Sequence, residues 1–203
     1  MKDAMEKTIQ TIRDEHRSIS AVLSGLRELA KMAQDPQLRP RFNVLHSMIH
    51  YIDAFPERLH HPKEEEYLFK PLQSRGQQTA ALVQELFHDH LTGARMARAL
   101  ERTLLAFEIE WPKGAAEFSA EVKAYTDFHW DHMRKEEREL LPLAQRCLTP
   151  EDWHAAAQAF AQNHDPLEVV PENDFDTLFT QIVNLAPAPI GLGEPWKKIN
   201  GKR

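Results

Sequence analysis

The chain has 203 residues, of which 42% are hydrophobic, enough for one compact domain with a buried core. Its net charge of −6 argues against a nucleic-acid surface, and no long apolar run predicts a membrane span. The first residues lack the apolar core of a signal peptide, and Cys147 has no partner for an internal disulfide. We therefore expect a soluble, cytoplasmic protein.

Apolar residues recur every three or four positions through most of the chain, which predicts an all-α fold. The first segment runs from about residue 4 to 33, and His16 takes one position of its apolar stripe. The second runs from about 37 to 73, where Pro56 and Pro62 each remove a backbone donor and tend to kink a helix. Another side of this segment carries residues that we expect to meet solvent or to support a site: His46, His50, Asp53 and Glu57.

The third segment, about 77–108, again has a histidine, His90, in its apolar stripe. The fourth, about 113–145, has three successive polar residues in its stripe, namely His129, His132 and Glu136. Four amphipathic helices of about 30 residues with short connections predict an up-down-up-down four-helix bundle over residues 1–146.

Residues 147–203 are predicted to form a short helical C-terminal extension and a loose tail. Thr149 precedes an acidic first turn and can cap a short helix near 150–162, and Asp174 can cap another at about 175–185. The last residues are rich in proline and glycine, which favours an extended or loose tail.

Two stretches of the chain share one pattern. HHPKEEEYLF begins at His60 and HMRKEERELLP begins at His132, 72 residues later, and both read H-x-x-K-E-E-x-x-L. Each contains HxxxE, which ends at Glu64 or Glu136, and residues four apart lie on the same helix face. With the stripe histidines, the chain reads H…HxxxE…H…HxxxE, one histidine helix and one HxxxE helix, twice.

Ionisable groups inside a bundle core need compensating charge, because a buried unpaired carboxylate costs several kcal/mol. Two divalent or trivalent metal ions supply it, with carboxylates able to bridge and imidazoles at terminal positions. A mixed nitrogen and oxygen set suits iron best, with manganese or zinc less favoured. The predicted ligands are His16, His60, Glu64, His90, His132 and Glu136.

Each feature alone has a plainer interpretation, since a single HxxxE is usually a solvated pair and a single stripe histidine is usually a core residue. The metal site is predicted from their duplication. Three roles stay open for His129: a supporting hydrogen-bond partner, a proton shuttle, or a polar core residue. The remaining acidic residues of the two stretches are expected in solvent: Glu65, Glu66 and Glu137.

The pattern resembles the hemerythrin-like, or HHE cation-binding, domain over about residues 8–146. The motifs that carry the resemblance are DEH at 14–16, HHPKEEEYLF at 60–69, HDHLTG at 88–93 and HMRKEERELLP at 132–142. It implies a four-helix bundle with two iron ions, joined by an oxo or hydroxo bridge and held by the six residues above, with the glutamates as bridges. The segment LTPEDWHAAAQAFAQNHDPL is similar to an extension of one bacterial subgroup.

The resemblance also implies a seventh ligand, for which His61 is the nearest match. Unbroken helix geometry turns His61 about 100° away from His60, but Pro62 permits a local bulge that would bring it inward. The alternative is a supporting or solvent-facing histidine. The family's oxygen carriers have a second histidine on the third helix and an aspartate on the fourth. Here Glu136 stands in that aspartate's place, at a different spacing.

These features predict a non-haem di-iron protein that binds or reacts with a small oxidant or diatomic, either dioxygen, nitric oxide or peroxide. Two alternatives stay open: iron storage or donation, and a module that senses oxygen or redox state without turnover. The sequence decides neither whether the chain is an enzyme nor its oligomeric state.

Overall fold

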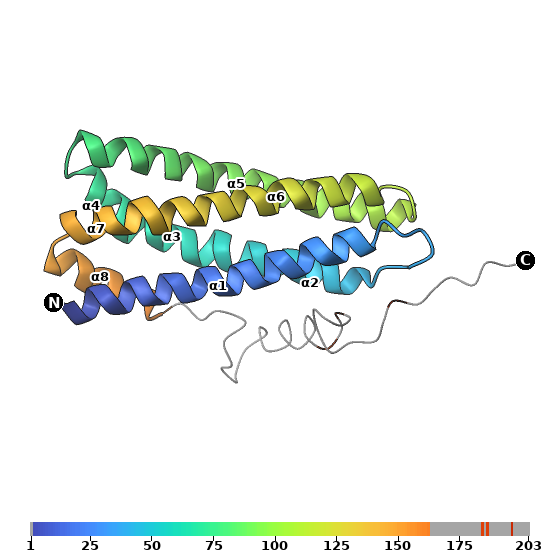
Figure 1. The fold of residues 1–203 in the computed structure, drawn as a ribbon, viewed down its shortest axis with the longest axis horizontal. Coiled ribbons are helices and arrows are strands. Elements are labelled where there is room, and N and C mark those ends of the chain that lie inside the picture. Colours follow the sequence, from blue (N-terminus) through green and yellow to red (C-terminus); the bar gives the residue numbers. More distant parts are fainter. Residues whose placement is uncertain (1, 163–183, 185, 187–195, 197–203) are drawn as a thin grey trace, which may run out of the picture.

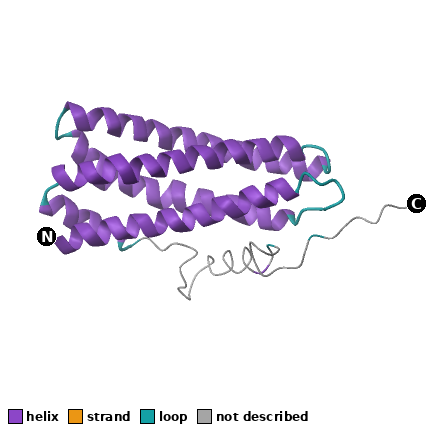
Figure 2. Ribbon diagram, in the orientation of Figure 1, coloured by secondary structure: helices purple, strands orange, loops and turns teal. Residues whose placement is uncertain are grey.

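The computed structural model describes residues 2–162, 184, 186 and 196. Within them, the prediction of an all-helical chain is confirmed (Figure 2). Four long helical stretches lie side by side, and short turns connect them at alternate ends of the molecule (Figure 1). In this part of the chain, no helix has both the length and the apolar character needed to cross a membrane. Most of the helix expected at about 175–185 and of the tail after it lies outside the described residues. Two described positions there, Ala186 and Trp196, are buried in an apolar cluster of the bundle, so the expectation of a loose tail is wrong at these positions.

The first stretch is α1 (Lys2–Met32) and the third is α5 (Gln77–Glu110). The second stretch alternates α-helical and π-helical segments, in the order α2 (Phe42–Ile52), η1 (Asp53–His60), α3 (His61–Glu64), η2 (Glu65–Phe69) and α4 (Lys70–Gln73). The fourth contains α6 (Ala115–Lys135), the π-helical η3 (Glu136–Leu140) and α7 (Leu141–Cys147). A shorter helix, α8 (Pro150–Phe160), follows.

Each π-helical segment ends two residues before a proline, which is Pro62, Pro71 or Pro142. The backbone N–H of the residue before the proline donates to the carbonyl oxygen five residues earlier. These pairs are His61 to Pro56, Lys70 to Glu65, and Leu141 to Glu136. A proline ring clashes with the carbonyl four residues earlier in a regular helix, and a wider turn relieves this clash. Because a π turn holds one more residue than an α turn, it changes which side chains face the core.

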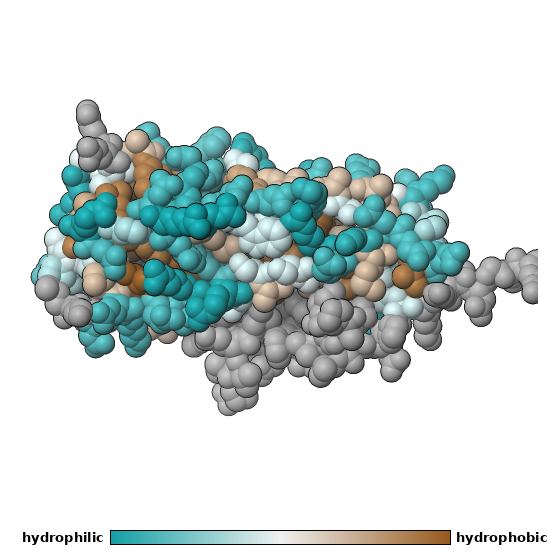
Figure 3. Space-filling model, viewed as in Figure 1, coloured by the Kyte–Doolittle hydropathy of each residue, from teal (hydrophilic) through white to brown (hydrophobic). Residues whose placement is uncertain are grey.

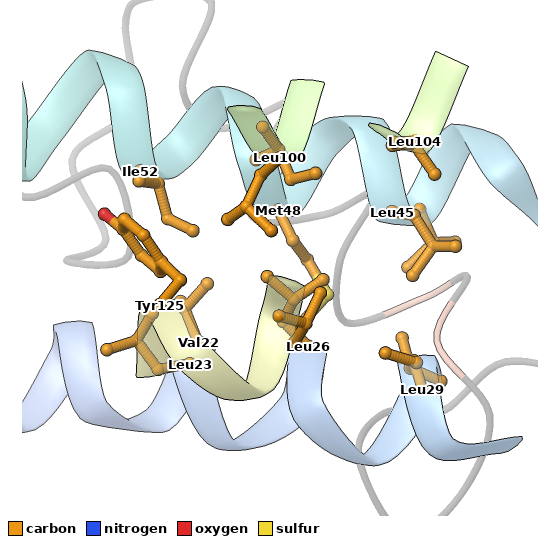
Figure 4. Packing of buried hydrophobic residues seen from close by; sticks show 14 of the residues in the cluster. Val22, Leu23, Leu26, Leu29, Leu45, Met48, Ile52, Leu100, Leu104 and Tyr125 are labelled. Atoms are coloured by element: carbon orange, nitrogen blue, oxygen red, sulfur yellow. The ribbon is translucent and has the colours of Figure 1, made fainter. Parts of the chain in front are cut away.

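Apolar side chains fill the bundle on both sides of a polar layer. On one side, α1, α2, α5 and α6 contribute fully buried residues such as Leu26, Leu45 and Leu100, part of the packing shown in Figure 4. On the other side, a second cluster joins Ile12 of α1 to Leu68 and Leu140. Hydrophilic side chains cover most of the face seen in Figure 3.

Helix α8 closes one end of the bundle. Thr149 and Asp152 form a capping box at its start, in which each side chain binds the backbone N–H of the other residue. Its buried Trp153 and Phe160 belong to the same apolar cluster as Ile12, and α8 packs against α1. In the last turn of α8, the Ala159 carbonyl oxygen accepts a hydrogen bond from Lys63 Nζ at 2.9 Å.

Candidate metal centre

All seven predicted site residues lie together inside the bundle, in the polar layer between the two apolar clusters. None of them is more than 4% exposed. They come from all four long stretches: His16 from α1, His60, His61 and Glu64 from the second stretch, His90 from α5, and His132 and Glu136 from the fourth.

The ligand atoms of these residues form two overlapping groups that share both glutamates. In the first, atoms of His16, His60, Glu64 and Glu136 all lie within 4.8 Å of one another, and in the second the same holds for Glu64, His90, His132 and Glu136. A third group brings His61 within the same distance of His90 and His132. The two ends of the layer are therefore unequal, because His61 adds an imidazole at one end.

Each glutamate directs its two oxygens to different ends of the layer. Glu64 Oε1 lies 3.5 Å from His60 Nε2, whereas its Oε2 lies 3.6 Å from His90 Nε2. Glu136 does the same, with Oε2 3.3 Å from His16 Nε2 and Oε1 3.2 Å from His132 Nε2. This is the arrangement that a bridging carboxylate needs, one oxygen for each of two ions.

The oxygens of Glu64 and Glu136 have no hydrogen-bond partner, although both carboxyl groups are completely buried. Burial and the charge of Glu136 raise the pKa of Glu64 well above its ordinary value. Burial would also raise the pKa of Glu136, but His132 and His16 hold it well below its usual range. Buried acceptors without donors are costly, so the residues fit a cation between them.

Four histidines of the centre each present Nδ1 to a carboxylate outside the layer. The distances are 3.0 Å from His16 to Glu137, 2.6 Å from His60 to Glu15, 2.8 Å from His90 to Glu65 and 3.6 Å from His132 to Asp89. The first three contacts are hydrogen bonds, which fix the tautomer and leave the other ring nitrogen free to bind a metal, whereas the His132–Asp89 distance is longer than a hydrogen bond.

These outer pairs follow a rule that the sequence prediction missed. The acidic residue before each stripe histidine, Glu15 or Asp89, faces the HxxxE histidine of its own half. The glutamate after each HxxxE, Glu65 or Glu137, faces the stripe histidine of the opposite half. The repeated unit is thus an acid-histidine pair followed by HxxxEE, and the acidic residues of DEH and HDH were its visible signal.

The expectation that Glu65 and Glu137 lie in solvent is confirmed only in part. Their side chains are 30% and 39% exposed, but each binds a buried imidazole of the layer. Helix periodicity put them beside the core stripe, and it did not show that a neighbouring helix brings a histidine there. Glu66 does face solvent, with a side chain 53% exposed.

His61 lies inside the bundle because the π-helical η1 changes the direction of the chain just before it. Its ring stacks on that of His90, with centroids 4.1 Å apart. Burial and the charges of His90 and His60 lower the pKa of His61 well below its ordinary value, so the ring is neutral. A neutral imidazole is the form that binds a metal.

The imidazoles at the two HxxxE positions differ in charge. Burial lowers the pKa of His132, but Glu136 and Asp89 outweigh this effect and raise it to about 9. For His60, burial dominates and the pKa is lowered. His129 is buried nearby, with its pKa lowered to about 3 by burial and by the charges of His132 and His90. His129 belongs to none of the three groups above.

A model of the hemerythrin HHE cation binding domain family matches residues 7–144, which is more than half of the chain and includes every residue of the layer. No curated protein matches the chain. The buried His and Glu groups could hold a metal ion, and the chain belongs to the hemerythrin HHE cation-binding domain family.

Proposed function

We propose that the chain is a non-haem di-iron protein that binds or reacts with dioxygen, nitric oxide or peroxide. The observation that carries the proposal is the division of the Glu64 and Glu136 oxygens between two sets of imidazoles. One ion would be held by His16 and His60 and the other by His61, His90 and His132, with both glutamates shared. The up-down-up-down order of the four stretches is part of this proposal, supported by their short turns at alternate ends.

The bound ions would supply redox chemistry and a position for a small ligand. The chain itself orients the imidazoles through the outer carboxylates and keeps water out of the layer by burial. The choice of iron rests on the donor set of five imidazoles and two carboxylates. This set could also bind manganese or zinc, but it suits them less well.

A groove supports access of a small molecule to one end of the layer. It lies between α1 and α6, has a volume of about 560 Å³, and is lined in part by His16, Ser20, Trp130, Met133 and Glu137. Met133 follows His132 as His61 follows His60, so Met133 takes the place of His61 at the other end of the layer. Met133 and His16 line the groove, which therefore lies beside the end that lacks His61. We infer that an external ligand reaches the ion at His16 and His60.

Iron storage or donation is less well supported than binding or reaction. None of the proposed ligands is more than 4% exposed, and the outer carboxylates hold three of the imidazoles in place through hydrogen bonds. Such a site releases its ions slowly, whereas a donor must release them readily.

Elemental analysis of protein produced with iron supplied tests the proposal first. We expect two irons per chain, and a folded chain that holds none would contradict it. Stopped-flow mixing of the reduced protein with peroxide or nitric oxide then separates the two forms of the proposal. Many turnovers per site indicate an enzyme, and a single stoichiometric event indicates a binding or sensing protein.

A further inference from the structure

Glu57 is a buried carboxylate that the proposed function does not use. Its side chain is 10% exposed, and its Oε2 lies 3.6 Å from Nδ1 of His61. The other four imidazoles also face a carboxylate through Nδ1, three of them in hydrogen bonds of 2.6 to 3.0 Å. The distance equals that of the His132–Asp89 pair, and in both pairs it is just longer than a hydrogen bond.

The surroundings of Glu57 hold its carboxylate in place. The Tyr125 hydroxyl donates to its Oε1 at 3.4 Å, and His129 Nε2 lies 3.9 Å from the same oxygen. Tyr125 stands at the edge of the apolar cluster, and its hydroxyl points away from the labelled leucines (Figure 4). Burial raises the pKa of Glu57 to about 7. The Glu57 carboxyl group thus faces the Tyr125 hydroxyl with Oε1 and the His61 imidazole with Oε2.

Gly93 on α5 provides the space for this cluster. A Cβ atom at that position would lie 2.9 Å from His129 Nε2 and 3.6 Å from Glu57 Oε1. The first distance is shorter than carbon and nitrogen tolerate without a shift of the ring. The ring of His129 is in turn parallel to that of His61, with centroids 5.9 Å apart. A side chain at this position would thus disturb His61 through His129.

The cluster exists in one half of the repeat only. Glu57 and His129 are equivalent, because each precedes its HxxxE histidine by three residues. Glu57 faces His61, whereas His129 has Met133 at the matching place. Glu57 is therefore not part of the set of outer carboxylates that occurs in both halves of the repeat.

We propose that Glu57 is a positioning residue that holds Nδ1 of His61 and thereby directs its Nε2 to the ion at His90 and His132. The inference rests on the proposed function. A neutral imidazole has one N–H, and a carboxylate that accepts it at Nδ1 leaves the lone pair of Nε2 for a metal. His129 Nε2 lies 3.9 Å from Glu57, farther than His61 Nδ1 does, so His129 packs beside the carboxylate without a hydrogen bond to it.

The test compares Glu57→Leu, Glu57→Gln, His61→Ala and the double variant Glu57→Leu/His61→Ala. Loss of an outer carboxylate typically weakens metal binding about 10- to 100-fold, so we expect Glu57→Leu to weaken the second iron to that extent. Glutamine still accepts a hydrogen bond, and Glu57→Gln should stay within a few-fold of the wild type. The double variant should bind as His61→Ala does, since Glu57 acts through His61.

The control is Asp53→Asn, one helical turn away, which removes a nearby negative charge without a contact to His61. It should leave the second iron in place. Unchanged affinity in Glu57→Leu would overturn the proposal. A double variant weakened by the product of the two single effects would overturn it as well, because the residues would then act independently.

A second readout needs no metal. Long-range proton–nitrogen spectra of the metal-free chain report the tautomer of His61, which should carry its proton on Nδ1 in the wild type and in Glu57→Gln. In Glu57→Leu this preference should be lost, and an unchanged tautomer would contradict the role of Glu57. Failure of the wild type to bind two ions would overturn the proposed function, and the tautomer would still decide the role of Glu57.

Discussion

Two layers of the same bundle are held together by opposite means. Around Leu26, Leu45 and Leu100, only apolar side chains meet, and their burial stabilises the fold whatever the protein binds. One layer away, seven ionisable side chains meet, and the oxygens of Glu64 and Glu136 have no donor. The apolar layers therefore supply the free energy of folding, and the polar layer reduces it unless cations bind there.

Replacement of a shared carboxylate should have the largest effect, because it changes both metal binding and the stability of the metal-free fold. Glu64→Leu is expected to abolish binding of both ions, because both sets of imidazoles lose an oxygen. The metal-free variant should nevertheless be more stable than the metal-free wild type by about 1–3 kcal/mol, since an unpaired buried polar group is removed. Elemental analysis and urea denaturation measure the two effects.

The matched control for Glu64→Leu is Glu66→Leu on the exposed side of the same stretch, which should change neither quantity. Two ions retained in Glu64→Leu would show that this carboxylate is not shared between them.

A cavity in the apolar layer should have the opposite effect. Leu26→Ala is expected to lower the free energy of unfolding by about 2–5 kcal/mol, because Leu26 is completely buried. The loss should be the same with and without metal, and two ions should still bind. Leu105→Ala, at a leucine 53% exposed, is the control and should change stability by less than about 0.5 kcal/mol. Loss of an ion in Leu26→Ala would show that the layers are not independent.

The two layers should also respond differently to pH. In the metal-free protein the pKa of His132 is raised from 6.5 to about 9, so the folded state keeps a proton that the unfolded chain releases. This stabilising contribution is complete below pH 6.5 and is lost as pH rises to about 9, by up to about 1.4 kcal/mol per pH unit. The pKa of His16 is also raised, which adds to the same trend.

In the metal-loaded protein, bound imidazoles are already neutral, and this loss should be absent. Denaturation curves from pH 7 to 9, with and without metal, make the comparison. Equal slopes in the two forms would contradict the assignment of His132 as a ligand.

The smallest effect concerns α8, which covers one end of the bundle. Thr149→Ala removes a capping box and should lower the free energy of unfolding by about 1 kcal/mol. Iron content should not change, because α8 contributes no residue to the layer. Thermal unfolding measures the shift, and Glu151→Gln in the same turn serves as the control. Loss of iron from Thr149→Ala would place α8 in the site.

Periodicity sufficed to predict the helices and the inward direction of His16, His90 and His132, because an unbroken helix fixes which residues share a face. It also placed Glu64 four residues from His60 on one face. The family resemblance added His61, but its inward direction depends on a π turn that ends before Pro62. A proline predicts such a disturbance without fixing how many residues the wider turn includes.

The outer carboxylates could not be predicted in the same way. Glu15 and Asp89 precede a stripe histidine, yet each serves a histidine on another helix. Glu57 was expected to meet solvent or to support the site, and the structure shows it buried against His61. Contacts between helices depend on their relative rotation and depth of packing, and the sequence of one helix contains neither.

The reciprocal pairs, His16 with Glu137 and His90 with Glu65, have a consequence for how such a centre can be encoded. Two copies of one helical hairpin in a symmetric dimer would make both contacts automatically, because an isologous interface repeats every contact. Identical copies, however, carry the same residue at equivalent places and cannot pair His61 in one half with Met133 in the other. A single chain that contains both halves lets each end of the centre change separately, so that the two proposed ions would differ in their ligands.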